Sequence, residues 1–439
     1  MSEASEPARG ERPLSGLRSG GAEPLLLAGG ATREGTDSAN PDARREAARV
    51  RCTWAEIDVA AITANARELN RLAGAARLLA VVKADGYGHG SVPAAKAALA
   101  GGATWLGVAL VEEGEVLRRS GITAPVLVLS EPRPSAMDQV VACDLRPTVY
   151  TSEGIEAAAQ AAGGLPSPLR VHVKVDTGMH RVGATPEAAI ELARLVAGRP
   201  ELHLEGLFTH LAVADEPDRA EDTAAQVATL RQVAGALAAV GVRPDLLHAA
   251  NSAGLLNHPD THLDLVRCGI ALYGLAPAPA LAAMADLHPA LALKAEVSFV
   301  KPLTAGQAVS YGLSWSAPAD TVLATVPIGY ADGVPRSYGA SGGQVLIGGR
   351  RCPVVGTVTM DQLLVDCGPG ATTSPGDECV LIGGQGDDEV TAWEWAERVG
   401  TIAYEVVCGL SSRVPRHLRS TACGAAPAEQ TAGEQGVHR

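Results

Sequence analysis

The sequence of 439 residues is poor in aromatic residues and contains no long apolar segment. Only 3% of its residues are aromatic, and phenylalanine occurs twice. No apolar run approaches the roughly 20 residues that a membrane-spanning helix needs, so we expect no membrane segment. The apolar stretch at residues 24–29 is too short for the core of a signal peptide. We therefore expect a cytoplasmic protein.

The chain also lacks the cysteine spacing of a metal or disulfide framework, and it lacks an excess of basic residues. Its eight cysteines are scattered without any Cys-x-x-Cys pair, which is typical of reduced thiols and predicts no metal site. The net charge is −13, whereas a protein that binds nucleic acid needs a basic surface. The charge balance therefore argues against nucleic acid as a partner.

What remains is a globular composition whose patterning changes along the chain. Hydrophobic residues make up 46% and charged residues 19%, as in a folded enzyme. Residues 1–50 show no helical or strand period, so we expect a disordered extension, with Val50 as a candidate start of the native protein. We expect a flexible tail at residues 421–439. Between them we expect two domains, at residues 53–295 and 296–420.

Strand and helix patterns alternate over the first of these domains. The strand patterns lie at residues 77–83, 104–110, 125–129, 145–150, 169–175, 202–210, 245–250 and 264–270. Eight repeats of this kind predict a (β/α)8 TIM-like barrel. A doubly wound open sheet stays as the alternative, because a strand count does not show closure. From residue 296 onward, short strands separated by Gly and Pro predict a mostly β domain.

One strand pattern leads directly into a lysine. The apolar run at residues 78–82 is followed by Lys83 and then by a turn with Gly86, Gly88 and Gly90. Burial at a strand end disfavours the ammonium form of lysine, and a neutral amine attacks carbonyl groups. A solvated lysine that merely ends a strand is the commoner situation. The neighbouring strand ends therefore decide between the two interpretations.

The other strand ends supply cations, a hydroxyl group and backbone amides. In a barrel these ends gather on one face. The groups expected there are Lys83, Lys174, Arg181, His210, Ser252, Arg267 and the amides of Gly269 and Ile270. No acidic cluster suited to a metal accompanies them, so the face is expected to be basic and to bind a phosphate together with a carboxylate. Pyridoxal phosphate, an aldehyde that acts as an electron sink for amino-acid carbanions, would use all of these groups.

Several segments resemble those of alanine racemases, in the same order along the chain. They are residues 80–90 (AVVKADGYGHG), 176–183 (DTGMHRVG), 209–210, 251–252, 266–274, 309–312 (VSYG), 328–333 (IGYADG), 360–362 (MDQ) and 413–416 (RVPR). The resemblance covers about residues 53–420. Two small departures occur. Asp85-Gly86 stands where many relatives carry Asn-Ala, and Thr359 precedes Met360 where Cys or Ser is frequent.

The resemblance implies a racemase that uses pyridoxal phosphate and two bases. Lys83 would hold the cofactor and act as base on one face of the substrate, with Tyr311 as acid or base on the other. Arg267 would hydrogen-bond the pyridine nitrogen. His210 would contact the cofactor ring, and Arg181 would bind the substrate carboxylate. Tyr330 and Met360 would close the pocket, and Lys174 would be carbamylated. The phosphate would be bound by Tyr87, Ser252, Gly269, Ile270 and Tyr404.

The resemblance also implies a homodimer and a role in supplying D-alanine for peptidoglycan. Tyr311, Tyr330 and Met360, in the second domain, would reach the barrel of the partner subunit. Three alternatives stay open. A serine or broad-spectrum racemase is excluded least well. A pyridoxal-phosphate decarboxylase would pair the pyridine nitrogen with an acid rather than with Arg267, and a non-enzymatic cofactor carrier would not need the second domain.

Overall fold

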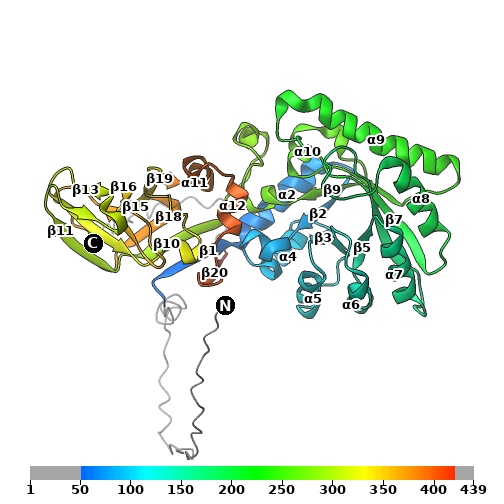
Figure 1. Cartoon of the computed structure of the whole chain (residues 1–439), viewed down its shortest axis with the longest axis horizontal. Helices are drawn as coiled ribbons and strands as arrows, with labels where there is room; N and C mark the ends of the chain where they lie inside the picture. The colour runs from blue at the N-terminus through cyan, green and yellow to red at the C-terminus, as the bar shows by residue number, and fades with distance from the viewer. Residues whose placement is uncertain (1–50, 421–439) are drawn as a thin grey trace, which may run out of the picture. The chain divides into compact units, whose positions relative to one another are not determined.

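The computed structural model describes residues 51–420, so the extension expected at residues 1–50 and the tail expected at 421–439 lie outside the described part. Within residues 51–420, no helix combines the length and the apolar character needed to cross a membrane. These residues form a sheet of eight strands, a sheet of ten strands and a small two-stranded sheet (Figure 1).

The eight-stranded sheet is parallel and closes nearly into a ring. Its strands are β2 (Arg77–Val81), β3 (Trp105–Val108), β4 (Val126–Val128), β5 (Arg146–Val149), β6 (Leu169–Lys174), β7 (Leu202–Phe208), β8 (Leu246–His248) and β9 (Leu265–Cys268). They pair in the order β8-β7-β6-β5-β4-β3-β2-β9. The two end strands of this order also meet, because Asp264 N donates to Leu247 O at 3.0 Å. Arg267 N likewise donates to Ala250 O at 3.0 Å. The predicted barrel is confirmed and the open doubly wound sheet is wrong.

Helices lie around this sheet (Figure 1). They are α2 (Val59–Ala73), α3 (Lys83–Tyr87), α4 (Ser91–Ala100), α5 (Val111–Arg119), α6 (Met137–Ala142), α7 (Ser152–Ala162), α8 (Pro186–Ala197), α9 (Ala220–Ala239) and α10 (Ser252–Asn257). Local chemistry sets their limits. At the start of α2, the Asp58 carboxylate accepts from Ala60 N and Ala61 N, a cap usually worth about 1 kcal/mol. At its end, Gly74 takes a φ of 63° that favours glycine.

The ten-stranded sheet is mostly antiparallel and comes mainly from the later part of the chain. Its strands are β1 (Thr53–Asp58), β10 (Leu291–Glu296), β11 (Phe299–Leu303), β14 (Thr321–Val326), β15 (Gln344–Ile347), β16 (Arg350–Val355), β17 (Leu363–Asp366), β18 (Glu378–Gln385), β19 (Asp388–Val390) and β20 (Arg416–Arg419). The pair β12 (Ala308–Val309) and β13 (Trp315–Ser316) and the helices α11 (Ala392–Val399) and α12 (Ala403–Cys408) complete this part. A mostly β second domain was predicted, and the structure confirms it.

Two strands of the ten-stranded sheet lie within the range 53–295 expected for the barrel. β1 pairs antiparallel with β10 and parallel with β20. No strand is predicted from the sequence at residues 53–58, because β1 precedes the alternating pattern and its partners lie far away in the chain. Pairing over such a distance leaves no local signal. The described part of the chain, which starts at residue 51, therefore contributes a strand to the second sheet before it enters the barrel.

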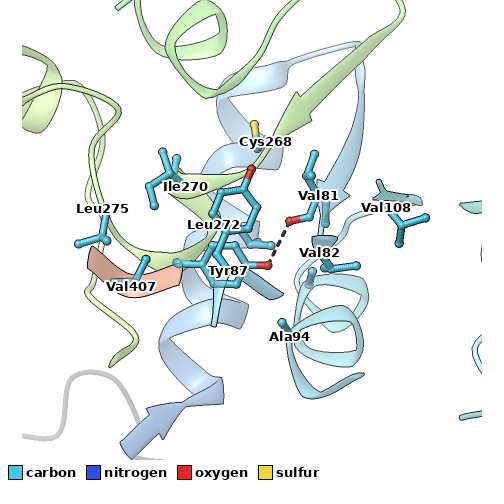
Figure 2. Close-up of a cluster of buried hydrophobic side chains, with 14 of the residues drawn as sticks. Val81, Val82, Tyr87, Ala94, Val108, Cys268, Ile270, Leu272, Leu275 and Val407 are labelled. Atoms are coloured by element: carbon cyan, nitrogen blue, oxygen red, sulfur yellow. Dashed lines mark hydrogen bonds between the residues drawn. The ribbon is translucent and has the colours of Figure 1, made fainter. Parts of the chain in front are cut away.

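The strand that leads to Lys83 is buried on both faces. Figure 2 shows Val81 and Val82 packed in a cluster with Val108 and Ile270. Tyr273 Oη donates to Val81 O at 3.1 Å, a bond drawn in the same view. Each buried valine contributes about 1.5–3 kcal/mol. Packing therefore fixes the backbone immediately before the lysine.

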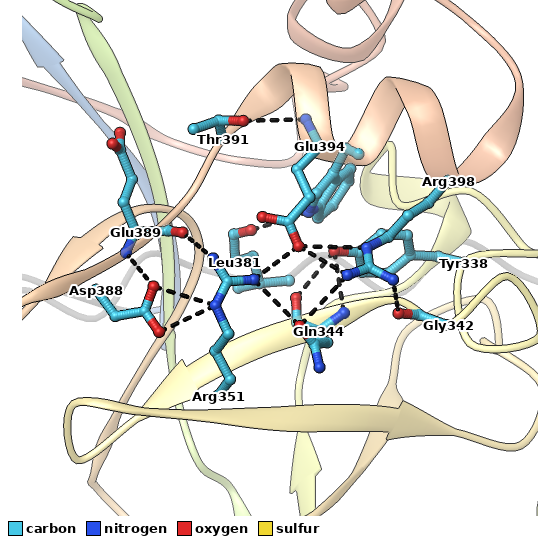
Figure 3. Close-up of polar contacts among 11 residues, drawn as sticks. Tyr338, Gly342, Gln344, Arg351, Leu381, Asp388, Glu389, Thr391, Glu394 and Arg398 are labelled. Atoms are coloured by element: carbon cyan, nitrogen blue, oxygen red, sulfur yellow. Dashed lines mark hydrogen bonds and ion pairs between the residues drawn. The ribbon is translucent and has the colours of Figure 1, made fainter.

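A polar network ties helix α11 to the second sheet (Figure 3). Glu394 Oε1 accepts from Arg351 Nη1 at 2.7 Å and from Arg398 Nη2 at 2.9 Å. Arg351 Nε also donates to Asp388 Oδ2 at 2.9 Å. Asp388 lies on β19, which pairs with β18. Trp395, on the same helix, is fully buried and its Nε1 donates to Leu381 O at 2.9 Å. These contacts hold α11, and α12 follows it directly in the chain.

Candidate active site

A cavity of about 610 Å³ lies at the carboxyl ends of the barrel strands. The structure brings most of the predicted site residues to its wall. They are Lys83, Tyr87, Lys174, Arg181, His210, Ser252, Arg267, Gly269, Ile270 and Tyr404. All except Tyr404 follow or end barrel strands, as expected from the convergence of strand ends in this fold. Tyr404 reaches the same cavity from α12.

The wall of the cavity carries four cations and, among the described residues, no carboxylate. The cations are Lys83, Lys174, Arg181 and Arg267. Burial, and then the charges of its cationic neighbours, lowers the pKa of Lys174 to about 8. Burial, and then Arg181, lowers the pKa of Lys83. An anion relieves such crowding of positive charge, so the cavity suits a ligand with phosphate and carboxylate groups.

Lys83 is followed by a left-handed turn. Ala84, Asp85 and Tyr87 have φ of 52°, 50° and 52°, and Gly86 has φ of 62°. A left-handed residue with a Cβ costs roughly 1–2 kcal/mol, and such strain clusters at functional sites. Asp, Asn and Gly tolerate this conformation best. The departure from the family at Asp85-Gly86 therefore preserves the turn.

Two carboxylates hold this turn, one from Glu113 outside it and one from Asp85 within it. Glu113 Oε1 accepts from Ala84 N at 2.7 Å, and Asp85 Oδ1 accepts from Ser91 N at 2.8 Å. Glu113 Oε2 also accepts from Ala109 N at 2.8 Å, after β3. Glu113 was not predicted as a site residue from the sequence. Its signal was a Glu at the third position of the helix that follows β3, where glutamate accepts from the preceding backbone.

One part of the cavity presents hydroxyl groups. Tyr87 is 8% exposed, and burial raises the pKa of its phenol, so the hydroxyl stays protonated. Its Oη lies against Gly269, where a Cβ would come within 2.3 Å of that oxygen. Ser252 Oγ accepts from Gly269 N at 3.0 Å, so the amide expected to bind phosphate donates to Ser252 here. The ring of Tyr404 lies 6.3 Å from that of Tyr87.

Arg267 is a buried cation, with 4% of its surface exposed. Its Nη2 donates to Thr209 O at 2.7 Å and to Ala249 O at 2.9 Å. Burial lowers its pKa to about 10, so the guanidinium stays charged at neutral pH. Since arginine only donates, His210 Nδ1, 3.3 Å from Nη2, is the acceptor. Burial, and then Arg267, lowers the pKa of His210 well below its ordinary range, so this ring is neutral.

Arg181 lies on the exposed side of the cavity wall. The turn that precedes it is held by Asp176, whose Oδ1 accepts from Gly178 N and His180 N, both at 3.0 Å. The turn therefore places Arg181 at the rim, where an incoming carboxylate would meet it first.

Tyr311, Tyr330 and Met360 do not line the cavity. They are 73%, 43% and 52% exposed, on neighbouring loops of the β region. Thr357 Oγ1 donates to Tyr311 O at 3.0 Å. Tyr330 N donates to Thr359 O at 2.9 Å, beside Met360. We call Tyr311, Tyr330 and Met360 the β-domain patch.

The backbone next to Tyr311 is strained. Ser310 has φ 63° and ψ −178°, a conformation that is essentially restricted to glycine. Its Oγ donates to Thr357 O at 2.6 Å, which holds the turn. Strain of this kind costs about 1–3 kcal/mol, persists only where the surrounding structure holds it, and clusters at functional sites.

Several residues of the cavity wall were not predicted as site residues, and Phe208 and Cys408 are two of them. Phe208 lies beneath two cations, with Arg267 at 5.2 Å and Lys174 at 5.5 Å from its ring centre. It lies two positions before His210, so alternation along the strand could have placed both on one face. Cys408 lies one turn after Tyr404 in α12, and no local pattern distinguishes it.

Comparison with known proteins yields consistent relatives. The family described as alanine racemase, N-terminal domain, matches residues 57–277, and alanine racemase, C-terminal domain, matches residues 290–418. The alanine racemase of Symbiobacterium thermophilum is 50% identical over 367 residues, or 84% of this chain and 97% of that protein. Among solved structures, the alanine racemase of Streptomyces lavendulae has a TM-score of 0.80 at 37% identity, over 85% of this chain and 98% of that one. A histidine racemase from Leuconostoc mesenteroides has a TM-score of 0.77 at 30% identity, over 85% and 99%.

Proposed function

Because the chain belongs to the alanine racemase family, we propose that it interconverts L-alanine and D-alanine with pyridoxal phosphate bound in the cavity. The observation that carries this proposal is the cavity wall of four cations, with a half-buried lysine at the end of β2. The donor set fits the cofactor. Lys83 offers an amine for its aldehyde, Tyr87 and Ser252 offer hydroxyls for its phosphate, and Arg267 offers a donor for its ring nitrogen.

The cofactor supplies an electron sink for the pair of electrons that remains when the α-proton leaves. The protein moves the proton. Lys83 Nζ takes or returns it on one face of the substrate α-carbon, and its lowered pKa favours the neutral, proton-accepting amine. Tyr311 Oη takes or returns it on the opposite face. Transfer on two faces inverts the centre without a rearrangement of the substrate.

Arg267 would set the protonation state of the cofactor's ring nitrogen. Its guanidinium stays charged at neutral pH and only donates, so Arg267 would hold the ring nitrogen of the bound cofactor in its unprotonated form. A ring without that proton would be a weaker electron sink, which would limit side reactions. His210, neutral and bonded to Arg267, would lie against the ring.

We infer that the functional unit is a homodimer with shared sites. The β-domain patch is exposed and its residues do not line the cavity of their own chain. A second copy that carries Tyr311, Tyr330 and Met360 over this cavity would supply the second base and the walls around the substrate methyl group. The strained turn at Ser310 would aim Tyr311 at the partner.

The chemistry of Lys174 favours a carbamate. A lysine with a pKa of about 8 has a neutral fraction at physiological pH, and a neutral amine adds to carbon dioxide with release of a proton. The product is an anion among Arg181, Arg267 and Lys83, which lowers the net positive charge of the wall and would orient Arg181 toward the substrate carboxylate.

The substrate range is the second part of the proposal. Alanine is the proposed substrate, and a serine or broad-spectrum racemase is the alternative, because a solved relative of the same fold is named a histidine racemase. In either case we propose a cytoplasmic enzyme, and for alanine a role in supplying D-alanine to peptidoglycan.

The test is incubation of the purified protein and pyridoxal phosphate with a panel of L-amino acids, followed by chiral chromatography. We expect D-alanine as the main product, and no product from Lys83→Ala. If the protein forms D-serine or D-histidine faster than D-alanine, that amino acid would replace alanine as the proposed substrate. Absence of every D-product would refute racemase activity.

A further inference from the structure

A line of buried polar side chains leads from the cavity into the interior of the barrel. Arg267 Nη1 lies 3.0 Å from His248 Nδ1, and His248 Nε2 lies 2.9 Å from His172 Nδ1. His172 Nε2 lies 3.3 Å from Glu205 Oε2. All four residues are buried, with at most 4% of any one exposed. We call Arg267, His248, His172 and Glu205 the barrel relay.

The chemistry of these groups allows one arrangement of protons. Arginine only donates, so His248 Nδ1 accepts and carries no proton. A neutral imidazole has a single N–H, which in His248 must be on Nε2 and donate to His172 Nδ1. The same reasoning places the proton of His172 on Nε2, where it donates to Glu205. Burial, the first cause in each case, lowers the pKa of both histidines, so both rings are neutral.

Glu205 completes the relay on the side where the strands begin. Arg146 Nε and Arg170 Nη1 lie 3.3 and 3.2 Å from its carboxylate oxygens. Burial alone would raise the pKa of Glu205, but the bond from His172 and the two guanidinium groups hold it below its ordinary value. The acceptor at the end of the relay is therefore a carboxylate at neutral pH.

The surrounding strands make room for the relay. A Cβ at Gly206 would come within 2.1 Å of His172 Nδ1, so glycine on β7 is what lets this ring enter the barrel. The pairing of β6 with β7 also shifts register between Val171 and His172. The ring of Phe208 stacks on His248 with centres 4.6 Å apart. These features confine both imidazoles to one orientation.

We infer that Glu205 and His172 are positioning residues for Arg267. They set the proton of His248 on Nε2, which keeps Nδ1 as an acceptor and fixes one terminal nitrogen of the guanidinium. If the proton of His248 moved to Nδ1, two N–H groups would face each other and Arg267 would turn. The consequence for catalysis rests on the proposed function, through the role of Arg267 at the cofactor, whereas the proton arrangement does not.

The direct test is long-range proton–nitrogen correlation NMR on the holoenzyme labelled with nitrogen-15 histidine. We expect His248 and His172 each to show an unprotonated Nδ1 and a protonated Nε2. A proton on Nδ1 of either ring, or a doubly protonated ring at neutral pH, overturns the inference. This measurement needs no variant and does not depend on turnover, so it separates the relay from the proposed racemase activity.

Variants then test the consequence. His172→Phe removes the acceptor for His248, and we expect an Nδ1 proton on His248, a shifted absorbance band of the bound cofactor and a loss of kcat of about tenfold. His172→Asn places Oδ1 where Nδ1 lies, so we expect His248 to keep its proton on Nε2 and the spectrum to return. The matched control is His203→Phe on the same strand as Glu205, where the ring is exposed and bonds Asp245. An unchanged His248 tautomer and spectrum in His172→Phe would overturn the positioning role.

Discussion

Single residues explain why the cavity can perform acid–base chemistry at neutral pH. Lys83 and Lys174 lie at the ends of β2 and β6, and burial lowers the pKa of both. They differ in surroundings, because Lys174 is 6% exposed and has Arg267 as its main charged neighbour. Burial therefore favours the neutral, nucleophilic form of both amines.

The first prediction concerns Lys174. At pH 8 about half of an amine with a pKa of about 8 is neutral, against under 1% for an ordinary lysine. With carbon-13-labelled bicarbonate, we expect a carbamate signal in the carbon NMR spectrum of the native protein. The signal should vanish in Lys174→Met. A signal that persists in this variant would place the modification elsewhere.

The same pKa implies a pH dependence of stability. The folded-state pKa of Lys174 lies below its unfolded value, so the unfolded chain binds the proton more tightly between about pH 8 and 10.4. The contribution of Lys174 to the free energy of unfolding therefore rises through this window. Urea unfolding of the cofactor-free protein should show this rise, and Lys174→Met should show a smaller one. Equal slopes for both proteins would contradict the lowered pKa.

The third prediction tests the second base. Tyr311→Phe should lower racemisation by about 10²–10⁴-fold, the usual contribution of a positioned acid or base. In deuterated water, one enantiomer of alanine should still exchange its α-proton, because Lys83 remains. Lys83→Ala should lose exchange of both enantiomers. Tyr150→Phe, a tyrosine outside the cavity wall, is the control, and exchange of both enantiomers in Tyr311→Phe would argue for a single base.

At the scale of secondary structure, the left-handed turn after β2 is the element that aims Lys83. Ala84, Asp85 and Tyr87, which flank Gly86, take positive φ. Hydrogen bonds to the carboxylates of Asp85 and Glu113 offset part of that strain. The identity of Asp85 therefore affects both stability and the site.

The fourth prediction follows from this turn. Asp85→Ala removes the acceptor for Ser91 N and places alanine at a φ of 50°, so we expect a loss of about 2 kcal/mol in the free energy of unfolding. Asp85→Asn keeps an acceptor oxygen and tolerates the same φ, so its loss should stay below about 0.5 kcal/mol. Urea denaturation measures both. Equal losses in the two variants would show that the carboxamide does not replace the carboxylate.

At the scale of the whole molecule, the two parts of the proposed site are separated within one chain. The cavity contains the residues proposed to bind the cofactor, while the β-domain patch is exposed. An isologous dimer would complete both sites at once, since the β-domain patch of each subunit would cover the cavity of the other. Leu313, 65% exposed beside Tyr311, would be covered by the same contact.

The last prediction is a complementation experiment. Lys83→Ala and Tyr311→Phe homodimers should each be nearly inactive. Mixing them under conditions that allow subunit exchange should restore up to about a quarter of the native activity, since half of the dimers would contain one intact site. Sedimentation should confirm that a dimer is the active species. No recovery after proven exchange would place both bases in one chain.

The sequence by itself predicted the eight alternating strands and helices and most of the residues proposed to bind the cofactor, whereas closure of the barrel was left open. The alternating periods at residues 77–270 are local signals, and convergence of strand ends is a property of the barrel, so Lys83, Lys174 and Arg267 could be placed on one face without coordinates. The motifs added Tyr87 and Tyr311 by resemblance. Each of these residues lies within a local sequence pattern, and that pattern predicts its surroundings.

The tertiary structure alone decided the features that depend on distant contacts. β1 joins the second sheet through pairing with β10, and the barrel relay assembles from four separate strands. Phe208 contacts cations that come from β6 and β9. Tyr311 is kept away from the cavity of its own chain. The physical reason is the same throughout. A period of two or of 3.6 residues reports which face is buried, but it does not report which distant residue covers that face.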